Sequence, residues 1–426
     1  MGIHPYALLS DEPSTKYNLS WVDNRPGADG SAQNLAYGTD SGNLNETVSA
    51  TGQAIPSSDA YVYHAKISGL SPDTAYFGRI DNEKDTPAFK TLPLALNTRE
   101  LLILIASDLH IDRDEAMPSS DGMIPLSRHN ADLLCMMGDI APTGGESEDS
   151  STANKWVRFL SDYQEKLNAN GMIPMFTDPG NHDVGNNSWA GTLETSDYPD
   201  DGGVKPNVGY YQLLFPNTKD LDPIGQNYGQ ITIGDKYVQL LALDTHSAYP
   251  EDVANWMQGA IDDDAKVVLP FFHSPMLRGG NRIANDLLLQ ELLREKWGTI
   301  LGSKDNIYCL FTGHIHLRNR SVPWALSNTH TSDSFGPYDG EYIRSNAPRN
   351  RIVEFGGGYR RDRTAISEWW VDYADSDDKQ YYLVSIGQSH MNVKEIDQDG
   401  NIYDDHTFVY KEPVITRTSK QIIVMP

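Results

Sequence analysis

From Glu100 onward the chain alternates short apolar runs with helical patterns. The apolar runs predict strands at residues 101–107, 133–137, 173–178, 238–243, 267–272, 307–312 and 351–355. Helices are predicted over residues 151–168 and 285–297, where large apolar side chains recur at helical spacing. This alternation favours α/β layers in which helices cover a largely buried sheet. From residue 381 the pattern returns to hairpins, with a tight turn expected at Asp399–Gly400.

The first 95 residues follow a different pattern. Short β-rich segments, such as those around Trp21 and Tyr76, are separated by Asn, Asp, Gly, Ser and Pro. This pattern is typical of an all-β sandwich. Within it, residues 65–80 (AKISGLSPDTAYFGRI) resemble the turn and late strand of a fibronectin type III domain. Residues 92–99 are predicted to be a linker, because Pro93 cannot continue a strand ladder.

The composition excludes several classes of protein. Among 426 residues, 34 are Lys or Arg and 59 are Asp or Glu, which gives a formal net charge of −25. A chain this acidic repels phosphate backbones and anionic membranes. We therefore expect neither general nucleic-acid binding nor docking on anionic membranes. No apolar run approaches the ~20 residues that a membrane span requires. The two cysteines, Cys135 and Cys309, exclude a disulfide scaffold and a thiolate metal cluster, and their apolar surroundings predict buried free thiols.

The first ten residues, MGIHPYALLS, lack the basic start and apolar core of a signal peptide. Two alternatives therefore stay open: the protein remains in the cytoplasm, or a leader has been removed. The fibronectin-like domain and the acidic composition favour a secreted or periplasmic location. Because such domains often serve adhesion, a docking partner for this domain also stays open.

Polar groups that can bind metals follow one predicted strand after another. They are Asp108, His110, Asp139, Asn181, His182, Asp183, His273, His314 and His316. Open α/β sheets bind their ligands at the carboxyl ends of strands. Ionisable residues are seldom buried unless they are paired or metal-bound, so this set indicates a metal site rather than core packing. Oxygen and imidazole ligands suit Zn, Mn or Fe, and a carboxylate can bridge two ions that clamp an in-line displacement.

The order D-x-H, GD, GNHD, H, GHxH, from Asp108 to His316, resembles the calcineurin-like metallophosphoesterase superfamily. A fibronectin-like domain ahead of these motifs resembles the arrangement in purple acid phosphatases. The resemblance implies a fibronectin type III-like sandwich over residues 1–95 and a four-layer α/β/β/α catalytic domain over 99–413. Residues 414–426 would form a C-terminal tail.

The resemblance also implies a role for each residue of the set. Asp108, His110 and His316 would hold one metal ion, Asn181, His273 and His314 would hold the other, and Asp139 would bridge them. His182 would lie over the substrate and stabilise or protonate the leaving oxygen. Asp183 would orient His182 through a hydrogen bond, as carboxylates often do for imidazoles.

Two positions depart from the purple acid phosphatase pattern. His110 stands where those enzymes have glycine, and Pro142 stands where they have an iron-binding tyrosine. We therefore expect no tyrosinate ligand and no purple band, and a metal pair drawn from Fe, Mn or Zn. His246, after the fourth strand, and Arg278, five residues after His273, are candidate substrate contacts. The alternatives are a locally bonded loop histidine and an ordinary surface arginine.

The implied function is dinuclear, metal-dependent hydrolysis of phosphate esters. A metal-activated hydroxide would attack phosphorus while His182 assists the leaving group. The domain arrangement favours a phosphomonoesterase by analogy, and a phosphodiesterase with the same centre is the alternative. A binding or structural protein with a vestigial hydrolase domain is a further alternative. The complete ligand set argues against it, because loss of function usually erodes ligands first.

Overall fold

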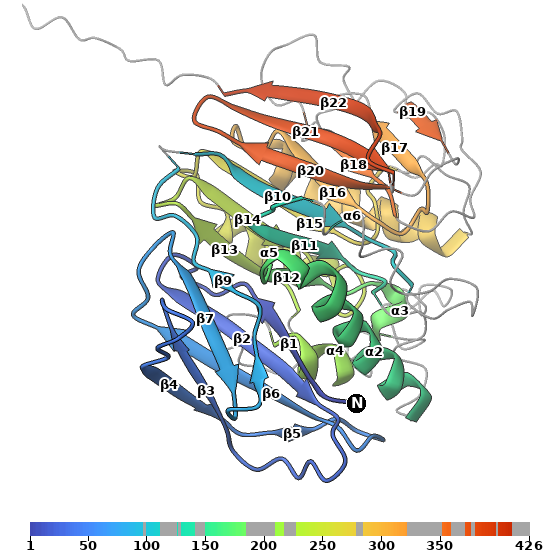
Figure 1. The fold of residues 1–426 in the computed structure, drawn as a ribbon. Coiled ribbons are helices and arrows are strands. Elements are labelled where there is room, and N and C mark those ends of the chain that lie inside the picture. Colours follow the sequence, from blue (N-terminus) through green and yellow to red (C-terminus); the bar gives the residue numbers. More distant parts are fainter. Residues whose placement is uncertain are drawn as a thin grey trace, which may run out of the picture.

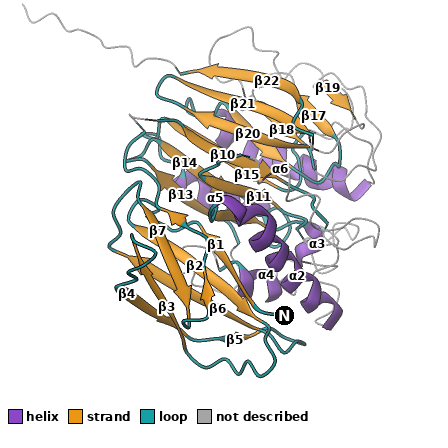
Figure 2. Cartoon of the chain, in the orientation of Figure 1, coloured by secondary structure: helices purple, strands orange, loops and turns teal. Residues whose placement is uncertain are grey.

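The computed structural model describes residues 1–96, 99–110, 126, 129–140, 150–184, 209–216, 227–277, 284–321, 352–358, 371–375, 380–397 and 399–410. Over these residues the chain forms sheets of ten, seven and five strands with helices packed against them (Figure 1). Strands and loops dominate the N-terminal part, whereas the helices belong to the remainder (Figure 2). None of the helices in these ranges combines the length and the apolar character needed to cross a bilayer.

The N-terminal part is a β-sandwich. One of its layers contains β1 (Ile3–Leu8), β2 (Lys16–Asp23), β5 (Gln53–Ala54) and β6 (Tyr61–Ser68). The other contains β3 (Gln33–Gly38), β4 (Glu46–Ala50), β7 (Ala75–Ile80), β8 (Lys84–Asp85) and β9 (Phe89–Lys90). Between them Trp21 stacks on Tyr63 with ring centroids 5.2 Å apart, inside a shared apolar core. The prediction of a β-rich N-terminal region is confirmed.

The ten-stranded sheet, called the first sheet below, continues from this sandwich into the catalytic region. The strands that this sheet contributes to the catalytic region are β10 (Leu101–Ala106), β11 (Leu133–Met137), β12 (Met175–Asp178), β20 (Gln380–Ile386), β21 (His390–Asp397) and β22 (Ile402–Val409). β10, β11 and β12 are parallel, and β12 also pairs in parallel with β1 at Met175 and Leu8. The expected turn at Asp399–Gly400 is present, with the Gly400 N–H donating to the Asp397 carbonyl.

The seven-stranded sheet, called the second sheet, faces the first. It contains β13 (Gly229–Ile233), β14 (Val238–Ala242), β15 (Val267–Phe272), β16 (Cys309–Thr312), β17 (Arg318–Ser321), β18 (Val353–Gly356) and β19 (Val371–Asp375). Its central strands β14, β15, β16 and β18 are parallel. The two sheets bury a common apolar core, in which Phe176 meets Phe271 edge to face. Cys135 and Cys309 are buried free thiols in that core, as predicted.

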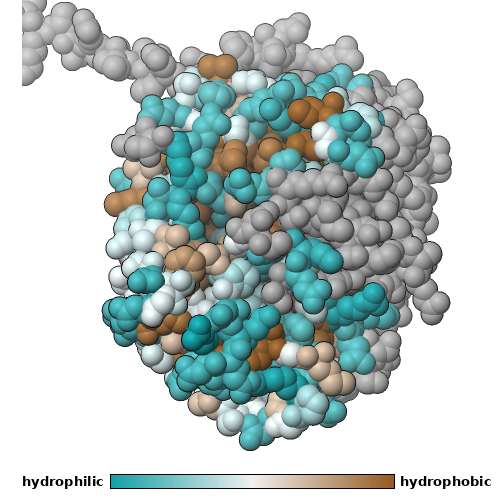
Figure 3. Space-filling view, viewed as in Figure 1, coloured by the Kyte–Doolittle hydropathy of each residue, from teal (hydrophilic) through white to brown (hydrophobic). Residues whose placement is uncertain are grey.

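Helices cover the faces of the two sheets that point away from this common core. The helices are α2 (Ser150–Lys166), η1 (Leu167–Asn170), α3 (Asn181–Val184), α4 (Gly209–Leu214), α5 (Pro250–Ala260) and α6 (Ala284–Gly302). Trp156 of α2 packs in a core on the first sheet, and Trp297 of α6 packs in a core on the second. The predicted α/β character of the catalytic region is confirmed. On the face drawn in Figure 3, hydrophilic residues cover most of the described surface.

The N-terminal sandwich and the catalytic region are joined by side chains as well as by the shared sheet. Tyr6 shares an apolar core with residues of α2 and α4, and its hydroxyl donates to the Leu214 carbonyl at 2.7 Å. The ring of His64 donates from Nε2 to the Leu213 carbonyl at 2.9 Å. The sandwich therefore packs as an integral part of the molecule against α4.

Candidate metal centre

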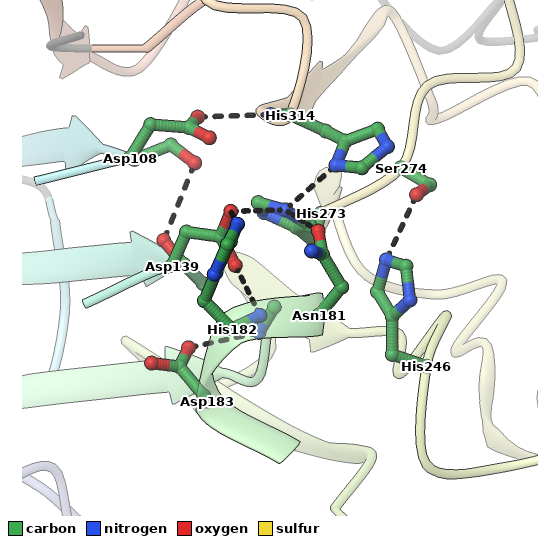
Figure 4. A network of polar contacts seen from close by, with 12 residues as sticks. Asp108, Asp139, Asn181, His182, Asp183, His246, His273, Ser274 and His314 are labelled. Atoms are coloured by element: carbon green, nitrogen blue, oxygen red, sulfur yellow. Dashed lines mark hydrogen bonds and ion pairs between the residues drawn. The ribbon is translucent and has the colours of Figure 1, made fainter. Parts of the chain in front are cut away.

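Side chains from both sheets meet where their parallel strands end (Figure 4). From the first sheet come Asp108 and His110 after β10, Asp139 after β11, and Asn181 and His182 at the start of α3 after β12. From the second sheet come His246 after β14, His273 after β15, and His314 and His316 after β16. The carboxylates and all of these histidines except His182 are buried. Predicted ligands separated by up to 208 positions in the sequence therefore share one site.

One group of metal-ligating atoms, the carboxylate cluster, contains Asp108, His110, Asp139 and His316. One ligand atom of each lies within 4.8 Å of those of the others. His316 Nε2 is 3.1 Å from Asp108 Oδ1, and His110 Nε2 is 3.5 Å from Asp139 Oδ2. The Nε2 atoms of His110 and His316 are only 3.1 Å apart. Converging carboxylate and imidazole atoms are a donor set that suits a divalent metal ion.

A second group, the imidazole cluster, contains His246, His273 and His314, whose ligand atoms also lie within 4.8 Å of one another. His273 Nε2 is 3.1 Å from His314 Nδ1 and 3.3 Å from Asn181 Oδ1. It is also 3.2 Å from Asp139 Oδ2. The same Asp139 oxygen thus faces both clusters.

The backbone is strained at the loops that carry these side chains. Left-handed φ angles occur at Asp108 (55°), His110 (45°), Asp139 (50°), His314 (70°) and His316 (55°). A left-handed conformation costs an L-residue other than glycine roughly 1–2 kcal/mol. Such strain clusters at functional sites, where the surrounding structure enforces it. Here it turns successive side chains toward one point.

Two glycines allow the backbone to pass close to the site. A Cβ at Gly138, whose φ is 76°, would lie 2.3 Å from the backbone nitrogen of Gly180. A Cβ at Gly358 would lie 2.4 Å from Asp108 Oδ2. Both positions therefore exclude any larger residue without movement of the site.

Backbone groups hold one oxygen of each carboxylate. Asp108 Oδ2 accepts the His314 N–H at 2.8 Å, and Asp139 Oδ1 accepts the His182 N–H at 2.8 Å. The His273 ring is fixed because its Nδ1 donates to the Met137 carbonyl at 2.6 Å. Hydrogen bonds of this kind orient imidazole ligands and leave the other nitrogen for a metal.

Glu354 of β18 contacts two of the segments that carry site residues. No sequence motif identifies it. Its buried carboxyl accepts the Leu277 N–H at 3.0 Å and the Thr312 hydroxyl at 3.2 Å. These contacts connect the loop after β15 to the end of β16. Burial raises the pKa of Glu354 to about 8.

The electrostatics of the site favour a bound cation. Burial alone would raise the pKa values of Asp108 and Asp139, but neighbouring imidazoles outweigh it and hold both well below the usual range. Burial lowers the pKa of His110 to about 3, so its ring is neutral and able to bind a metal. Burial would also lower the pKa of His273, but Asp139 raises it to about 9. Metal binding there would displace a proton.

The donor atoms pass a direct test of fit. Asp108 Oδ1 and Asp139 Oδ2 are buried and, among the residues that the structure describes, accept no well-aligned hydrogen bond. Their close polar neighbours are imidazole nitrogens, His316 Nε2 at 3.1 Å and His273 Nε2 at 3.2 Å. Buried carboxylate oxygens without a donor are costly, and a cation satisfies them. The residues present therefore fit metal binding at this site.

The remaining predicted residues occupy distinct places. His182 leaves 25% of its side chain exposed, and its Nε2 is 4.0 Å from Asp139 Oδ2. The Asp183 carboxylate accepts the N–H groups of Ile140 and Gly180, at 3.0 and 2.9 Å. These contacts show Asp183 bracing the backbone of two site loops, and its orientation of the His182 ring stays a prediction. Arg278 lies outside the described residues.

Comparisons with known proteins follow the same division of the chain. Residues 4–91 match the family model "Purple acid Phosphatase, N-terminal domain", and residues 101–318 match the model "Calcineurin-like phosphoesterase". The second match spans just over half of the chain. The chain belongs to the calcineurin-like phosphoesterase family. As a member it is a metal-dependent phosphoesterase, and phosphate esters are its class of substrate.

No curated protein matches the chain. Among solved structures, a predicted phosphoesterase of Streptococcus pneumoniae TIGR4 is 13% identical, with a TM-score of 0.26. The match covers 73% of this chain and 99% of that one. Vacuolar protein sorting 29 of Cryptosporidium parvum is 14% identical, with a TM-score of 0.27, covering 73% of this chain and 98% of its own. Likenesses this low carry no conclusion about function.

Proposed function

We propose that the centre binds two metal ions and hydrolyses phosphate monoesters. Asp108, His110 and His316 hold one ion, Asn181, His273 and His314 hold the other, and Asp139 bridges them. The observation that carries this proposal is the position of Asp139 Oδ2, which is 3.5 Å from His110 Nε2 and 3.2 Å from His273 Nε2. A single oxygen facing both clusters is the arrangement that a shared carboxylate requires.

The proposal includes the architecture of the catalytic region. Two facing sheets with helices outside each support a four-layer α/β/β/α sandwich over residues 99–413. The N-terminal domain then covers residues 1–95 and the tail residues 414–426. In this arrangement the site lies at the strand ends, where side chains of both sheets reach it.

Bound metal ions would lower the pKa of coordinated water and neutralise charge on the phosphoryl oxygens. The chain's own residues supply the rest. Asp139 would contribute to holding both ions, since its Oδ2 faces a ligand nitrogen of each cluster. The partly exposed ring of His182, close to Asp139 and in edge contact with His110, can hold a proton for the leaving oxygen. Asp183 fixes the loop that carries His182.

A monoester substrate is favoured by the N-terminal match to purple acid phosphatases. The test compares hydrolysis of a nitrophenyl phosphate monoester with that of the bis-ester, by the metal-loaded protein at several pH values. A higher kcat/KM for the monoester is expected. Faster turnover of the diester would make the protein a phosphodiesterase, and loaded protein that hydrolyses neither would support a vestigial domain.

The role of His182 is tested by the His182→Ala variant. We expect kcat to fall about 100-fold while both metal ions remain bound, because general acid catalysis typically contributes 100-fold or more. Substrates with a good leaving group should lose less, since they need little proton donation. Unchanged kcat on a poor leaving group, or loss of metal, would show that the assigned role is wrong.

A further inference from the structure

We infer that His246 is an additional ligand of the metal position in the imidazole cluster, which makes that position rich in neutral nitrogen donors. This inference rests on the proposed two-metal centre and assigns His246 a role other than substrate contact. It stands on three observations: the burial of His246, the hydrogen bonds that hold its loop, and the convergence of its ring with two other imidazoles.

The loop after β14 holds His246 inside the protein. Its side chain is buried at 2% exposure, although it lies in a loop rather than in a strand. Asp244 Oδ1 accepts the N–H groups of His246 and Ser247, at 2.8 and 2.7 Å. The Thr245 hydroxyl accepts the Ser274 N–H at 3.2 Å, which joins this loop to the residue after His273. Burial and these hydrogen bonds therefore fix the position of the ring.

The ring of His246 converges with the other imidazoles of the cluster. Its centroid is 5.3 Å from that of His273 and 5.6 Å from that of His314 (Figure 4). One ligand nitrogen from each of the three rings lies within 4.8 Å of the others. Ligands about 2.0–2.1 Å from one tetrahedral zinc ion are ~3.4 Å apart. A contraction of about 1.5 Å or less would bring all three nitrogens to a single ion.

With His246 included, the two metal positions differ in the chemical type of their ligands. The carboxylate cluster offers two negative charges, from Asp108 and Asp139, whereas the imidazole cluster offers three imidazole rings and shares only Asp139. Imidazole ligands suit Zn²⁺, and carboxylates suit harder ions such as Mn²⁺. We therefore assign Zn²⁺ as the preferred ion of the imidazole cluster.

Ser274 offers the means to distinguish a ligand from a structural histidine. His246 Nε2 lies 2.9 Å from Ser274 Oγ. The alternative is therefore a structural role, in which this hydrogen bond only connects the two loops. Ser274→Ala removes that tie and keeps the ring. His246→Gln keeps a side chain able to hydrogen-bond Ser274 and removes the imidazole.

The experiment strips the full-length protein of metal with a chelator and titrates it with Co²⁺, followed by its visible absorption, and with Zn²⁺, followed by calorimetry. Wild type should bind two ions. His246→Gln and His246→Ala should weaken one of them about 100-fold or more, because loss of an outer contact alone costs 10–100-fold. The Co²⁺ spectrum of that position should change, and added imidazole should restore it in His246→Ala. In Ser274→Ala the affinity for that ion should fall by about 10-fold at most.

Equal Zn²⁺ affinity and an unchanged Co²⁺ spectrum in both His246 variants would overturn the inference, and a raised KM alone would return His246 to a substrate contact. A loss in Ser274→Ala as large as that in His246→Gln would show a structural tie instead. All three outcomes leave the proposed function intact. Wild-type protein that binds no ion at all would contradict the proposed function itself.

Discussion

The two sheets contribute unlike chemistry to the same site. The first sheet supplies both carboxylates, Asp108 and Asp139, whereas the described strand ends of the second sheet supply imidazoles. The carboxylate cluster includes His316 of the second sheet. The three rings of the imidazole cluster all come from the second sheet, and Asp139 of the first sheet faces one of them, His273. We infer that the metal centre depends on how the two sheets are held against each other, so that the apolar core between them helps to set its geometry.

The largest effect is expected from removing the charge that both clusters share. Asp139→Asn keeps the shape of the side chain but takes away the bridging carboxylate, so we expect kcat/KM to fall about 1,000-fold or more. Metal analysis should show less than one tightly bound ion per chain. Asp235→Asn is the matched control, because Asp235 has nearly the same left-handed φ of 51° in an exposed turn. Retention of both ions in Asp139→Asn would show that the two metal positions do not depend on a shared carboxylate.

A second change weakens the contact between the sheets without touching a ligand. Phe176 of β12 packs on Phe271 of β15, with ring centroids 5.4 Å apart, two residues before His273. Phe176→Ala should lower the free energy of unfolding by about 3–5 kcal/mol, as large core truncations do. Denaturant titration measures that loss, and calorimetry at a temperature where the variant is folded should show weaker binding of both metal ions.

Phe215→Ala serves as the control for that variant. Phe215 is equally buried but packs between α2, α4 and the N-terminal strands, away from the intersheet core. We expect a similar loss of stability with unchanged metal affinity. If both variants lost the same metal affinity, general destabilisation would explain the result and the special role of the intersheet core would be refuted.

A smaller effect is expected at Gly358, which follows β18 of the second sheet and lies close to the Asp108 carboxylate of the first sheet. Gly358 follows β18, and a Cβ there would lie 2.4 Å from Asp108 Oδ2. Gly358→Ala should displace Asp108 and weaken metal binding at the carboxylate cluster about 10-fold, the scale of outer-contact changes. Gly229→Ala adds a Cβ with nothing within 4 Å, and it should leave both affinities unchanged. Equal affinities in the two variants would refute the proposed close contact.

The smallest effect concerns the extension of the first sheet into the N-terminal sandwich. Burial lowers the pKa of His64 to about 4 from its ordinary value of 6.5. The unfolded chain therefore binds more protons between these values, so His64 contributes stability above pH 6.5 that is lost as the pH falls toward 4. Because the ring is only partly buried, we expect on the order of 1 kcal/mol.

Thermal unfolding of wild type and His64→Gln at pH 7.5 and pH 5 measures this contribution. The drop in Tm between the two pH values should be about 1–2 °C larger in wild type, given the size of the chain. Identical drops would mean that the burial of His64 between the sandwich and α4 gives no pH dependence to stability.

Much of the catalytic fold could be predicted because buried parallel strands are short, continuous apolar runs. The expected strands at residues 133–137 and 267–272 match β11 and β15 residue for residue. Each run is followed by Asp, Asn or His, so the position of the site at the strand ends was also predictable. The family resemblance then divided the ligands between two positions, a division that the geometry supports for Asp108 and His316.

Other features leave no local pattern in the sequence. The parallel pairing of Leu8 with Met175 joins segments that are far apart along the chain, and nothing near either residue signals it. Left-handed φ at Asp108 is imposed by its surroundings, since aspartate adopts it only at a cost. Glu354 sits in an apolar strand, where its role depends on the two loops that pack on it. Helix α5 had a readable signal, because Pro250 and the acidic residues after it mark a helix start.

The central claim is that two metal positions, each built from both sheets, share Asp139. Anomalous diffraction from crystals of the metal-loaded protein tests it most directly. We expect two anomalous peaks about 3.5–4 Å apart, one beside Asp108 and His316 and one beside His273 and His314, with the Asp139 carboxylate between them. A single peak, or two peaks that do not share Asp139, would contradict it.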